Sequence, residues 1–521
     1  MKRLEERKRV FQSIDIQELQ RKREESSVEL RKKKRLSSFS KKRALHSAPH
    51  FGNSNLFENL LPEHFLGLYP ELFAPNLDEN SKLEVLLNYI SSSYEISDLI
   101  LVLNRVLKNF PNSAFAQVYN SGVPKRLLNS LGSNPQLDRN IVSCLVNLAC
   151  APQEYLQGLI EAQVVELIAK VFFSTECQVL KELCVWAHAN LAGTDTNCRN
   201  KVIATGVWHA CLRCLNQNTS LEFLSTVVWM ISNLCRGTPC PPRNLCREVL
   251  GMIPKFLRVN NAEVVKDTCW ILNFLTDSSE ELISEVLKTN CSKDILDLIA
   301  NSNRDVQVPA LRTVGNILAG SDFHTQTLLN LGVIEKLVPL LASPVRAIKK
   351  EALWGISNIL AGNQQQVSQV IQHPCMQCVV ECLQEPDLQL RKEAIWCVAN
   401  STRFLKAHLV VKLVEMGALE QLVESLEFPD SKVLMTVLKA VENILTAGND
   451  ALAPKKSFKV NDFAVKFHQI GGLNKLEKLQ MHPNKLVYKM SVKIIGKFYG
   501  FEHKNDENIE NKNVPQVFDF Y

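Results

Sequence analysis

The stretch Lys350-Glu-Ala-Leu-Trp-Gly-Ile-Ser-Asn358 decides the fold, because a close copy of it follows after a fixed interval. The copy is Lys392-Glu-Ala-Ile-Trp-Cys-Val-Ala-Asn400, 42 residues further along the chain. In both stretches an Asn follows a Trp by four residues, which places the two side chains on one face of a helix. A helix face that returns every 42 residues indicates a stacked array of helical repeats.

The same interval extends toward the N-terminus. The positions in phase are Trp186 with Asn190, Trp229 with Asn233, and then Trp270 and Arg312. A glycine followed by Val or Ala keeps a related interval, at Gly122, Gly206, Gly332 and Gly417. Each glycine precedes an apolar helical stretch, as a turn residue between helices should. The sequence therefore predicts an all-α solenoid over residues 81–500, with about ten three-helix repeats whose third helix bears the Trp/Asn face.

Composition excludes several other classes of protein. A repeat of about 42 residues makes most of the 521-residue chain one array rather than several domains. We find no apolar run long enough for a membrane span and no signal-peptide core. Sixteen cysteines in such a chain indicate reduced thiols of the cytosol or nucleus. Cys211 and Cys214 form one of two Cys-x-x-Cys pairs, but they align with Leu337 and Leu340, so we expect core residues and no metal or cofactor.

Charge divides the chain unevenly. Residues 1–43 contain 16 Lys+Arg and 7 Asp+Glu, a net charge of +9, which leaves −3 for the remainder. This arm is rich in helix-forming residues but poor in apolar ones, so we expect it to fold on a partner. Residues 44–80 are predicted to be a linker, part of which packs on the array because it is aromatic. Residues 501–521 are predicted to be a disordered acidic tail.

The Trp/Asn face has the chemistry of a peptide-binding surface. Spaced Asn side chains can donate to and accept from the backbone of an extended peptide. Indoles provide walls for the aliphatic parts of Lys and Arg, with a cation–π attraction of about 0.5–2 kcal/mol each. Carboxylates such as Asp267, Glu351 and Glu393 can meet the cationic groups. We expect this row to be exposed, because buried Asn in every repeat would each need a partner, and we expect its ligand to be an extended basic peptide.

Several motifs resemble the importin alpha family of armadillo-repeat nuclear import adaptors. In the array these are Asn233-Leu-Cys-Arg-Gly237, Val308-Pro-Ala-Leu-Arg-Thr-Val-Gly-Asn-Ile317 and the stretch ending at Asn358. In the arm, Glu18-Leu-Gln-Arg-Lys-Arg-Glu-Glu25 and Val28-Glu-Leu-Arg-Lys-Lys-Lys-Arg35 are similar to the family's importin-beta-binding segment. The resemblance implies a right-handed armadillo superhelix, cargo with basic nuclear localisation signals, and importin beta bound through residues 1–43.

The resemblance also implies two peptide sites. The major site would comprise Asn147, Trp186, Asn190, Trp229, Asn233, Arg236, Asp267 and Trp270. The minor site would comprise Arg312, Asn316, Asp322, Thr325, Glu351, Trp354, Ser357, Asn358, Glu393, Trp396 and Asn400. The basic arm residues that would bind importin beta or compete with cargo are Arg21, Lys22, Arg23, Arg31, Lys32, Lys33, Lys34, Arg35, Lys41, Lys42 and Arg43.

The major site departs from the family pattern. Ser143 stands where the family has a Trp, and Leu183 replaces an expected polar residue. The family's pocket for a key lysine uses a Gly-Thr turn and an acidic residue, where this chain has Ala151-Pro152 and Thr194. We therefore expect a weakened major site and a more important minor site.

The resemblance further implies shuttling between cytoplasm and nucleus. A nuclear export receptor for recycling and nuclear pore proteins are additional implied partners, and no membrane is involved. Lys41-Lys-Arg43 resembles a cargo signal, so the arm is expected to compete with cargo for the Trp/Asn face.

Three other functions are weighed against this interpretation. An armadillo scaffold for adhesion or signalling would share the array but needs neither the basic arm nor the Trp/Asn face. Direct nucleic-acid binding by the arm is disfavoured, because acidic residues are interleaved with its basic ones and it has few aromatics. An enzyme is not expected, because we find no phosphate-binding Gly loop and no nucleophile motif. His188 is expected to line the groove.

Overall fold

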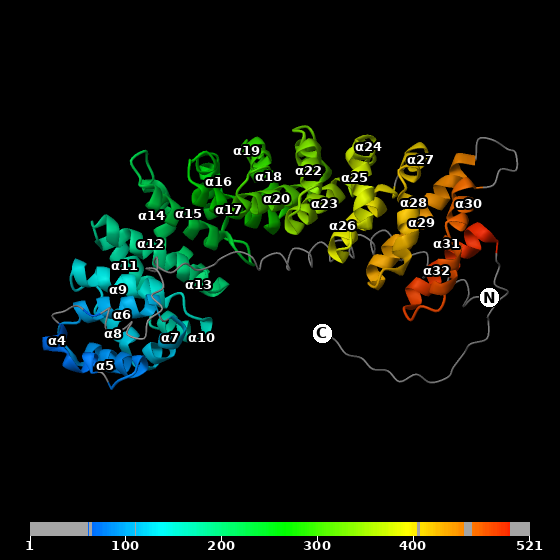
Figure 1. The fold of residues 1–521 in the computed structure, drawn as a ribbon. Coiled ribbons are helices and arrows are strands. Elements are labelled where there is room, and N and C mark those ends of the chain that lie inside the picture. Colours follow the sequence, from blue (N-terminus) through cyan, green and yellow to red (C-terminus); the bar gives the residue numbers. More distant parts are fainter. Residues whose placement is uncertain are drawn as a thin grey trace, which may run out of the picture. The chain divides into compact units, whose positions relative to one another are not determined.

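A computed structural model describes residues 61, 65–74, 76–109, 111–403, 407–452 and 461–500 (Figure 1). All regular secondary structure in these ranges is helical. The chain divides into two compact units, residues 1–289 and residues 290–521. The predicted tail and the basic arm residues 1–43 lie outside the described ranges.

The first unit contains short helices joined by tight turns. These are α4 (Phe65–Leu68), the 3₁₀ helix η2 (Pro70–Phe73), α5 (Glu79–Ser92), α6 (Ser97–Asn109), α7 (Pro111–Asn120), α8 (Val123–Asn129), α9 (Pro135–Leu148), α10 (Gln153–Glu161), α11 (Val164–Ser174), α12 (Gln178–Ala192), α13 (Thr196–Thr205), α14 (Val207–Cys214), α15 (Leu221–Cys235), α16 (Arg243–Leu257), α17 (Ala262–Ser278) and α18 (Glu280–Lys288).

The second unit continues the same pattern. Its helices are α19 (Ser292–Leu298), α20 (Arg304–Leu318), α21 (Asp322–Leu329), α22 (Val333–Leu341), α23 (Arg346–Leu360), α24 (Gln364–Gln372), α25 (Cys375–Glu381), η3 (Cys382–Gln384), α26 (Leu388–Ser401), α27 (Ala407–Glu415), α28 (Ala418–Glu424), η4 (Ser425–Glu427), α29 (Ser431–Leu452), α30 (Asp462–Gln469), α31 (Gly472–Leu479) and α32 (Lys485–Tyr499).

Within each unit, the last helix of a repeat packs on its counterpart in the next repeat. In the first unit the series is α6, α9, α12, α15 and α17, and in the second it is α20, α23, α26, α29 and α32. We call these the third helices. Ten of them lie in the described residues, in agreement with about ten repeats. The repeats ending in α6 and α17 are shorter than predicted, because only α5 and α16 precede those two helices.

Apolar residues beside the Trp/Asn face hold the third helices in the core. The residue before each of four tryptophans is apolar and fully buried, namely Val185, Val228, Leu353 and Ile395. Successive residues on a helix lie about 100° apart, so burial of this position fixes how each third helix is rotated against the core.

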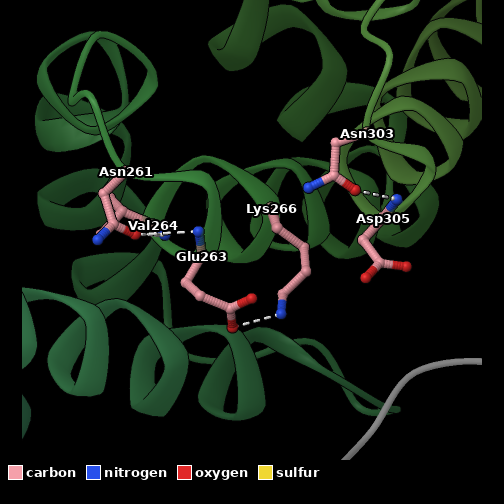
Figure 2. Close-up of polar contacts among 6 residues, drawn as sticks. All are labelled: Asn261, Glu263, Val264, Lys266, Asn303 and Asp305. Atoms are coloured by element: carbon pink, nitrogen blue, oxygen red, sulfur yellow. Dashed lines mark hydrogen bonds and ion pairs between the residues drawn. The ribbon is translucent and has the colours of Figure 1, made fainter.

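Polar caps and glycines set the ends of the helices. Asn261 and Asn303 are the N-caps of α17 and α20, and the Asn303 side chain accepts from the Asp305 N–H (Figure 2). A cap of this kind satisfies backbone donors that the first turn leaves unpaired. The glycines at 122, 206, 332 and 417 have φ of 77°, 73°, 76° and 87° and precede α8, α14, α22 and α28. Their predicted role as turn residues is confirmed, since positive φ favours glycine.

Part of the predicted linker is folded onto the array. Phe65 of α4 and Leu72 of η2 are fully buried. The Tyr69 ring lies between Phe65 and Tyr89 of α5, with centroid distances of 4.9 Å to each. These edge-on contacts extend the core beyond the N-terminal end of α5.

The prediction that Cys211 and Cys214 both belong to the core is correct for only one of them. Cys211 is buried as predicted, but Cys214 is exposed, so its assignment to the core is wrong. It is the last residue of the short helix α14.

Among the described residues, no group of three or more His, Cys, Asp or Glu could hold a metal ion. No helix in the same ranges is long and apolar enough to cross a membrane.

Candidate peptide-binding site

Most of the predicted site residues fall on the third helices, and the two predicted sites separate between the two units. Asn147 lies on α9, Trp186 and Asn190 on α12, Trp229 and Asn233 on α15, and Asp267 and Trp270 on α17. Arg312 and Asn316 lie on α20, Glu351, Trp354, Ser357 and Asn358 on α23, and Glu393, Trp396 and Asn400 on α26. Every predicted major-site residue is thus in the first unit and every minor-site residue in the second. We call the Trp and Asn positions the ladder.

The ladder amides are bonded across repeats in one recurring way. In four of the ladder Asn residues the Nδ2 donates to the backbone carbonyl that immediately precedes the ladder Asn of the previous helix in the series. The acceptors are Val146 for Asn190 (3.0 Å), Ala189 for Asn233 (2.9 Å), Gly315 for Asn358 (2.9 Å) and Ser357 for Asn400 (3.0 Å). This bond fixes which side of each amide is the donor, so the ladder is oriented by the packing of neighbouring third helices.

The expectation of an exposed row is wrong for most of the ladder. Trp229 and Trp354 are 1% and 0% exposed, and Asn190 and Asn233 are also buried. The premise behind the expectation fails, since each of these amides has a partner in the preceding repeat. Trp186 and Trp396 are half-buried.

Indoles contact one another and their neighbouring helices. The Trp186 and Trp229 rings meet edge to face, with centroids 6.3 Å apart and an interplanar angle of 79°. The Trp270 ring stacks on Phe274, which occupies the position four residues on where the other repeats have Asn. The ladder in α17 therefore presents an aromatic pair instead of an indole and an amide.

Gly315 of α20 makes room for the Trp354 indole. A Cβ atom built at Gly315 would lie 2.0 Å from Cζ3 and 2.4 Å from Cε3 of that ring. The Gly315 carbonyl also accepts the Asn358 bond. One residue thus receives both the indole and the amide of the next repeat, and only glycine fits there. Sequence reasoning missed this role, although a glycine within a helical pattern is a visible signal.

Acidic groups lie beside the minor-site ladder as predicted. Glu351 and Glu393 are each 4% exposed, and Arg312 Nε lies 3.5 Å from Glu351 Oε1. Arg312 stands in phase with the tryptophans, so a cation occupies the place of an indole and pairs with the next repeat. At the start of α21, Thr325 Oγ1 donates to the Leu318 carbonyl and Asp322 is exposed.

The first position of the major site is built differently. Ser143 Oγ accepts a hydrogen bond from Asn104 Nδ2 at 2.7 Å, and Asn147 Nδ2 donates to Asn104 Oδ1. A polar cluster of three side chains, of which Asn104 and Asn147 are buried, therefore replaces the indole wall that the family pattern has here. The Asn147 amide thus donates to a side chain, whereas the amides of Asn190, Asn233, Asn358 and Asn400 donate to the backbone.

Two further departures lie around the expected lysine pocket. Ala151 is 1% exposed and lacks a polar side chain. The Thr194 hydroxyl oxygen is buried, with no hydrogen-bond partner in the described part of the chain. His188 is 0% exposed, with its ring nitrogens 2.8 Å and 3.1 Å from the Cys184 and Val165 carbonyl oxygens. The expectation that His188 lines the groove is therefore wrong, because it bridges α12 to α11 within the core.

A buried arginine supports the loop that contains Arg236. Arg199 of α13 is 1% exposed, and its guanidinium donates to the carbonyls of Arg236 (2.7 Å), Gly237 (3.3 Å) and Pro239 (2.9 Å). Burial lowers the pKa of Arg199. Sequence reasoning missed Arg199, because no spacing relates it to residues 37 to 40 positions away.

Comparisons with known proteins agree with this geometry. Residues 7–82 match the importin beta binding domain, residues 322–361 and 363–400 the armadillo/beta-catenin-like repeat, and residues 461–513 the atypical Arm repeat. The chain is 31% identical to importin subunit alpha-3 of Arabidopsis thaliana, covering 99% of this chain and 95% of that protein. It is 32% identical to importin subunit alpha-1b of Oryza sativa subsp. japonica, covering 78% and 76%.

A solved structure supports the fold alone. An engineered protein superposes with a TM-score of 0.70 at 20% identity, covering 80% of this chain and 98% of that one. Repeats of short helices with a ladder along their third helices define an armadillo-repeat protein. The chain belongs to the importin alpha family. It is a nuclear import adaptor whose N-terminal segment is an importin beta binding domain, so the predicted fold, family and adaptor role are confirmed.

Proposed function

We propose that this adaptor binds extended basic nuclear localisation signals on its ladder, and that the minor site contributes more than the major site. The observation that supports this ranking is that the major site lacks the indole that the family pattern has at its first position. In the minor site, Trp354 and Trp396 each have an Asn and a carboxylate on the same helix. In the major site, Ser143 and its bond to Asn104 replace the indole.

The expected size of the loss follows from the missing groups. One indole wall contributes roughly 1 kcal/mol to holding a lysine, and a charge-assisted bond about 1.5–3 kcal/mol. Together these two contributions correspond to a roughly 70- to 900-fold weaker lysine pocket. Partial exposure to solvent moves the expected value toward the lower end.

Titration of a single-cluster basic peptide tests the ranking. Trp396→Ala should weaken binding more than Trp229→Ala does, and thermal melts should accompany both because Trp229 is buried. The ranking is wrong if Trp229→Ala abolishes binding while Trp396→Ala has little effect.

A gain-of-function variant tests the same proposal without removing a buried tryptophan, so that a loss of folding is not mistaken for a loss of binding. Ser143→Trp together with Thr194→Asp should restore one indole wall and one carboxylate to the major site. We expect the double variant to bind the basic peptide at least ten-fold more tightly, and Trp229→Ala to remove this gain in affinity. Unchanged affinity in a folded double variant would contradict the weakened-site proposal.

The basic arm is proposed to have two uses. Residues 1–43 would bind importin beta, which the match to the importin beta binding domain supports. In the absence of importin beta, Lys41-Lys-Arg43 would compete with cargo as an intramolecular ligand, at an effective concentration set by the linker. A scaffold for adhesion or signalling does not account for this arm.

Recycling completes the proposed cycle. An import adaptor that enters the nucleus with its cargo must leave it again, so we include an export receptor and nuclear pore proteins among the partners. The protein would then shuttle between cytoplasm and nucleus. Imaging of a fluorescent fusion before and after a block of nuclear export tests this, and cytoplasmic fluorescence unchanged by the block would contradict it.

A further inference from the structure

The last helix of the array has a row of lysines. Lys485, Lys489, Lys493 and Lys497 follow one another every four residues along α32. Residues four apart lie on one helix face, and the row spans about 18 Å at 1.5 Å per residue. All four side chains are exposed. We call this row the lysine stripe.

The lysine stripe lies next to the ladder. Helix α32 packs on α29, the third helix of the preceding repeat. Lys493 and Lys497 lie 2.8 Å and 3.6 Å from the Glu442 carboxylate, and Lys497 Nζ also donates to Thr446 Oγ1 at 2.9 Å. Glu442 precedes Asn443, whose amide donates to Thr402 of α26. The lysine stripe therefore lies on the helix that packs against α29, and α29 contains Asn443, whose side-chain amide donates to the preceding repeat.

The sign of the charge changes at this point. Residues 461–500 contain seven lysines, two acidic residues and no arginine, whereas the body of the chain as a whole is slightly acidic. Lys485 and Lys489 form no ion pair within the described part of the chain. Four cations along one face, with a single carboxylate near two of them, repel a basic peptide and attract an acidic one.

Apolar side chains lie among the lysines. Leu486 is 52% exposed and falls on the same side of α32 as the stripe, and Met481 just before the helix is 89% exposed. Two such residues can receive apolar side chains of a peptide between its carboxylates. Glu442 demonstrates that the stripe already accommodates a carboxylate in contact with two lysines.

We propose that the lysine stripe binds an acidic peptide segment of a partner protein, with alternating carboxylates and apolar residues. An extended segment of about five or six residues covers 18 Å. The apolar side chains of Met481 and Leu486 and the absence of arginine favour a peptide over a nucleic acid, because apolar groups have no partner along a phosphate backbone and arginine is the side chain that matches phosphate with two hydrogen bonds. The stripe is distinct from the proposed cargo site, which attracts peptides of the opposite charge.

Fluorescence anisotropy with the full-length chain tests the proposal. The probe is a fluorescein-labelled peptide of four Glu-Glu-Leu units, at physiological ionic strength. We expect saturable binding that Lys485→Glu/Lys489→Glu weakens at least ten-fold. Lys125→Glu/Lys170→Glu is the matched control, because it makes the same charge change at exposed, unpaired lysines of the first unit. A single-cluster basic peptide should bind both double variants as it binds the parent, which separates this surface from the cargo site.

Three outcomes would overturn the proposal. The first is no binding of the acidic probe, or equal loss in both double variants. The second is tighter binding of a twelve-residue oligothymidylate than of the acidic probe, which would assign the stripe to nucleic acid. The third is a ten-fold gain in probe affinity on Asp506→Asn/Glu507→Gln/Glu510→Gln, which would identify the chain's own tail as the occupant.

Discussion

Gly315 links two repeats at the scale of a single residue. Its Cα lies against the Trp354 indole and its carbonyl accepts the Asn358 bond. A methyl group added here would meet the ring at 2.0 Å, with helix backbone on the other side. The indole of the neighbouring repeat must therefore move, and with it one wall of the minor site.

Gly315→Ala is expected to destabilise the protein by about 1–3 kcal/mol and to weaken basic-peptide binding at the minor site. Chemical denaturation and peptide titration measure the two effects. Gly251→Ala in α16 is the matched control, since a Cβ there has nothing within 4 Å. That control should be neutral or gain up to about 1 kcal/mol from helix propensity. Equal behaviour of the two variants would refute the steric role of Gly315.

His188 links stability to pH at the same scale. Burial lowers the pKa of the imidazole, which its bonds to two carbonyl oxygens only partly oppose. A group with a lowered folded-state pKa binds protons more readily in the unfolded chain, so its contribution to stability is lost as the pH falls through about 6.5. When the pH is lowered from 7.5 to 5.5, the melting temperature of the His188→Gln variant should fall by less than that of the parent. A larger loss in the variant would reverse the assigned direction.

At the scale of elements, the loop after α15 depends on a neighbouring helix. The guanidinium group of Arg199 on α13 donates hydrogen bonds to three backbone carbonyls of the loop that begins with Arg236. A lysine ammonium group cannot replace the planar guanidinium here, because it is a compact point charge and cannot donate to the same carbonyls in several directions. The position of Arg236 at the major site is therefore tied to a residue outside the ladder.

Arg199→Lys should cost about 2–4 kcal/mol in the free energy of unfolding, since several charged hydrogen bonds are lost. Basic-peptide binding to the first unit should weaken in parallel, while binding to the second unit should not change. Arg213→Lys on the exposed end of α14 provides a control with the same substitution. Denaturation profiles that coincide for the two variants would exclude the supporting role.

The sequence predicted the elements well because their signals are local. The Trp/Asn spacing and the turn glycines depend on nearby residues and return every 42 residues or so, and the predicted ladder positions all lie on third helices. Burial of the ladder was predicted wrongly. Asn190 and Asn233 are bonded to carbonyls 44 residues earlier, and a pattern within one helix does not reveal how the next helix lies against it.

At the scale of the whole molecule, the basic arm is proposed to compete with cargo for the ladder. Lys41-Lys-Arg43 has the composition of a cargo signal, and the altered Ser143 position removes one of the walls that would hold it. The cost of cargo displacing the arm is then small. Self-inhibition should consequently be weak in this chain compared with a chain whose two sites both match the family pattern.

Deletion of residues 1–43 should change the affinity for a basic cargo peptide by less than about three-fold, roughly 0.6 kcal/mol. Binding of importin beta should be lost in the same variant. Isothermal titration with cargo peptide and with importin beta measures both. A gain of cargo affinity well above ten-fold on deletion would show strong self-inhibition and contradict the weakened major site.

The sequence by itself determined the helical class, the repeat length, the positions of the ladder, the basic arm and the family. These follow from periodicities and motifs in which each residue is read with its near neighbours. Only the tertiary structure decided how the ladder is held: the amide bonds between repeats, the seat of Trp354 on Gly315, the polar cluster at Ser143 and the loop contacts of Arg199. Each joins residues about 40 positions apart, and their contact depends on how one third helix is rotated and shifted against the next.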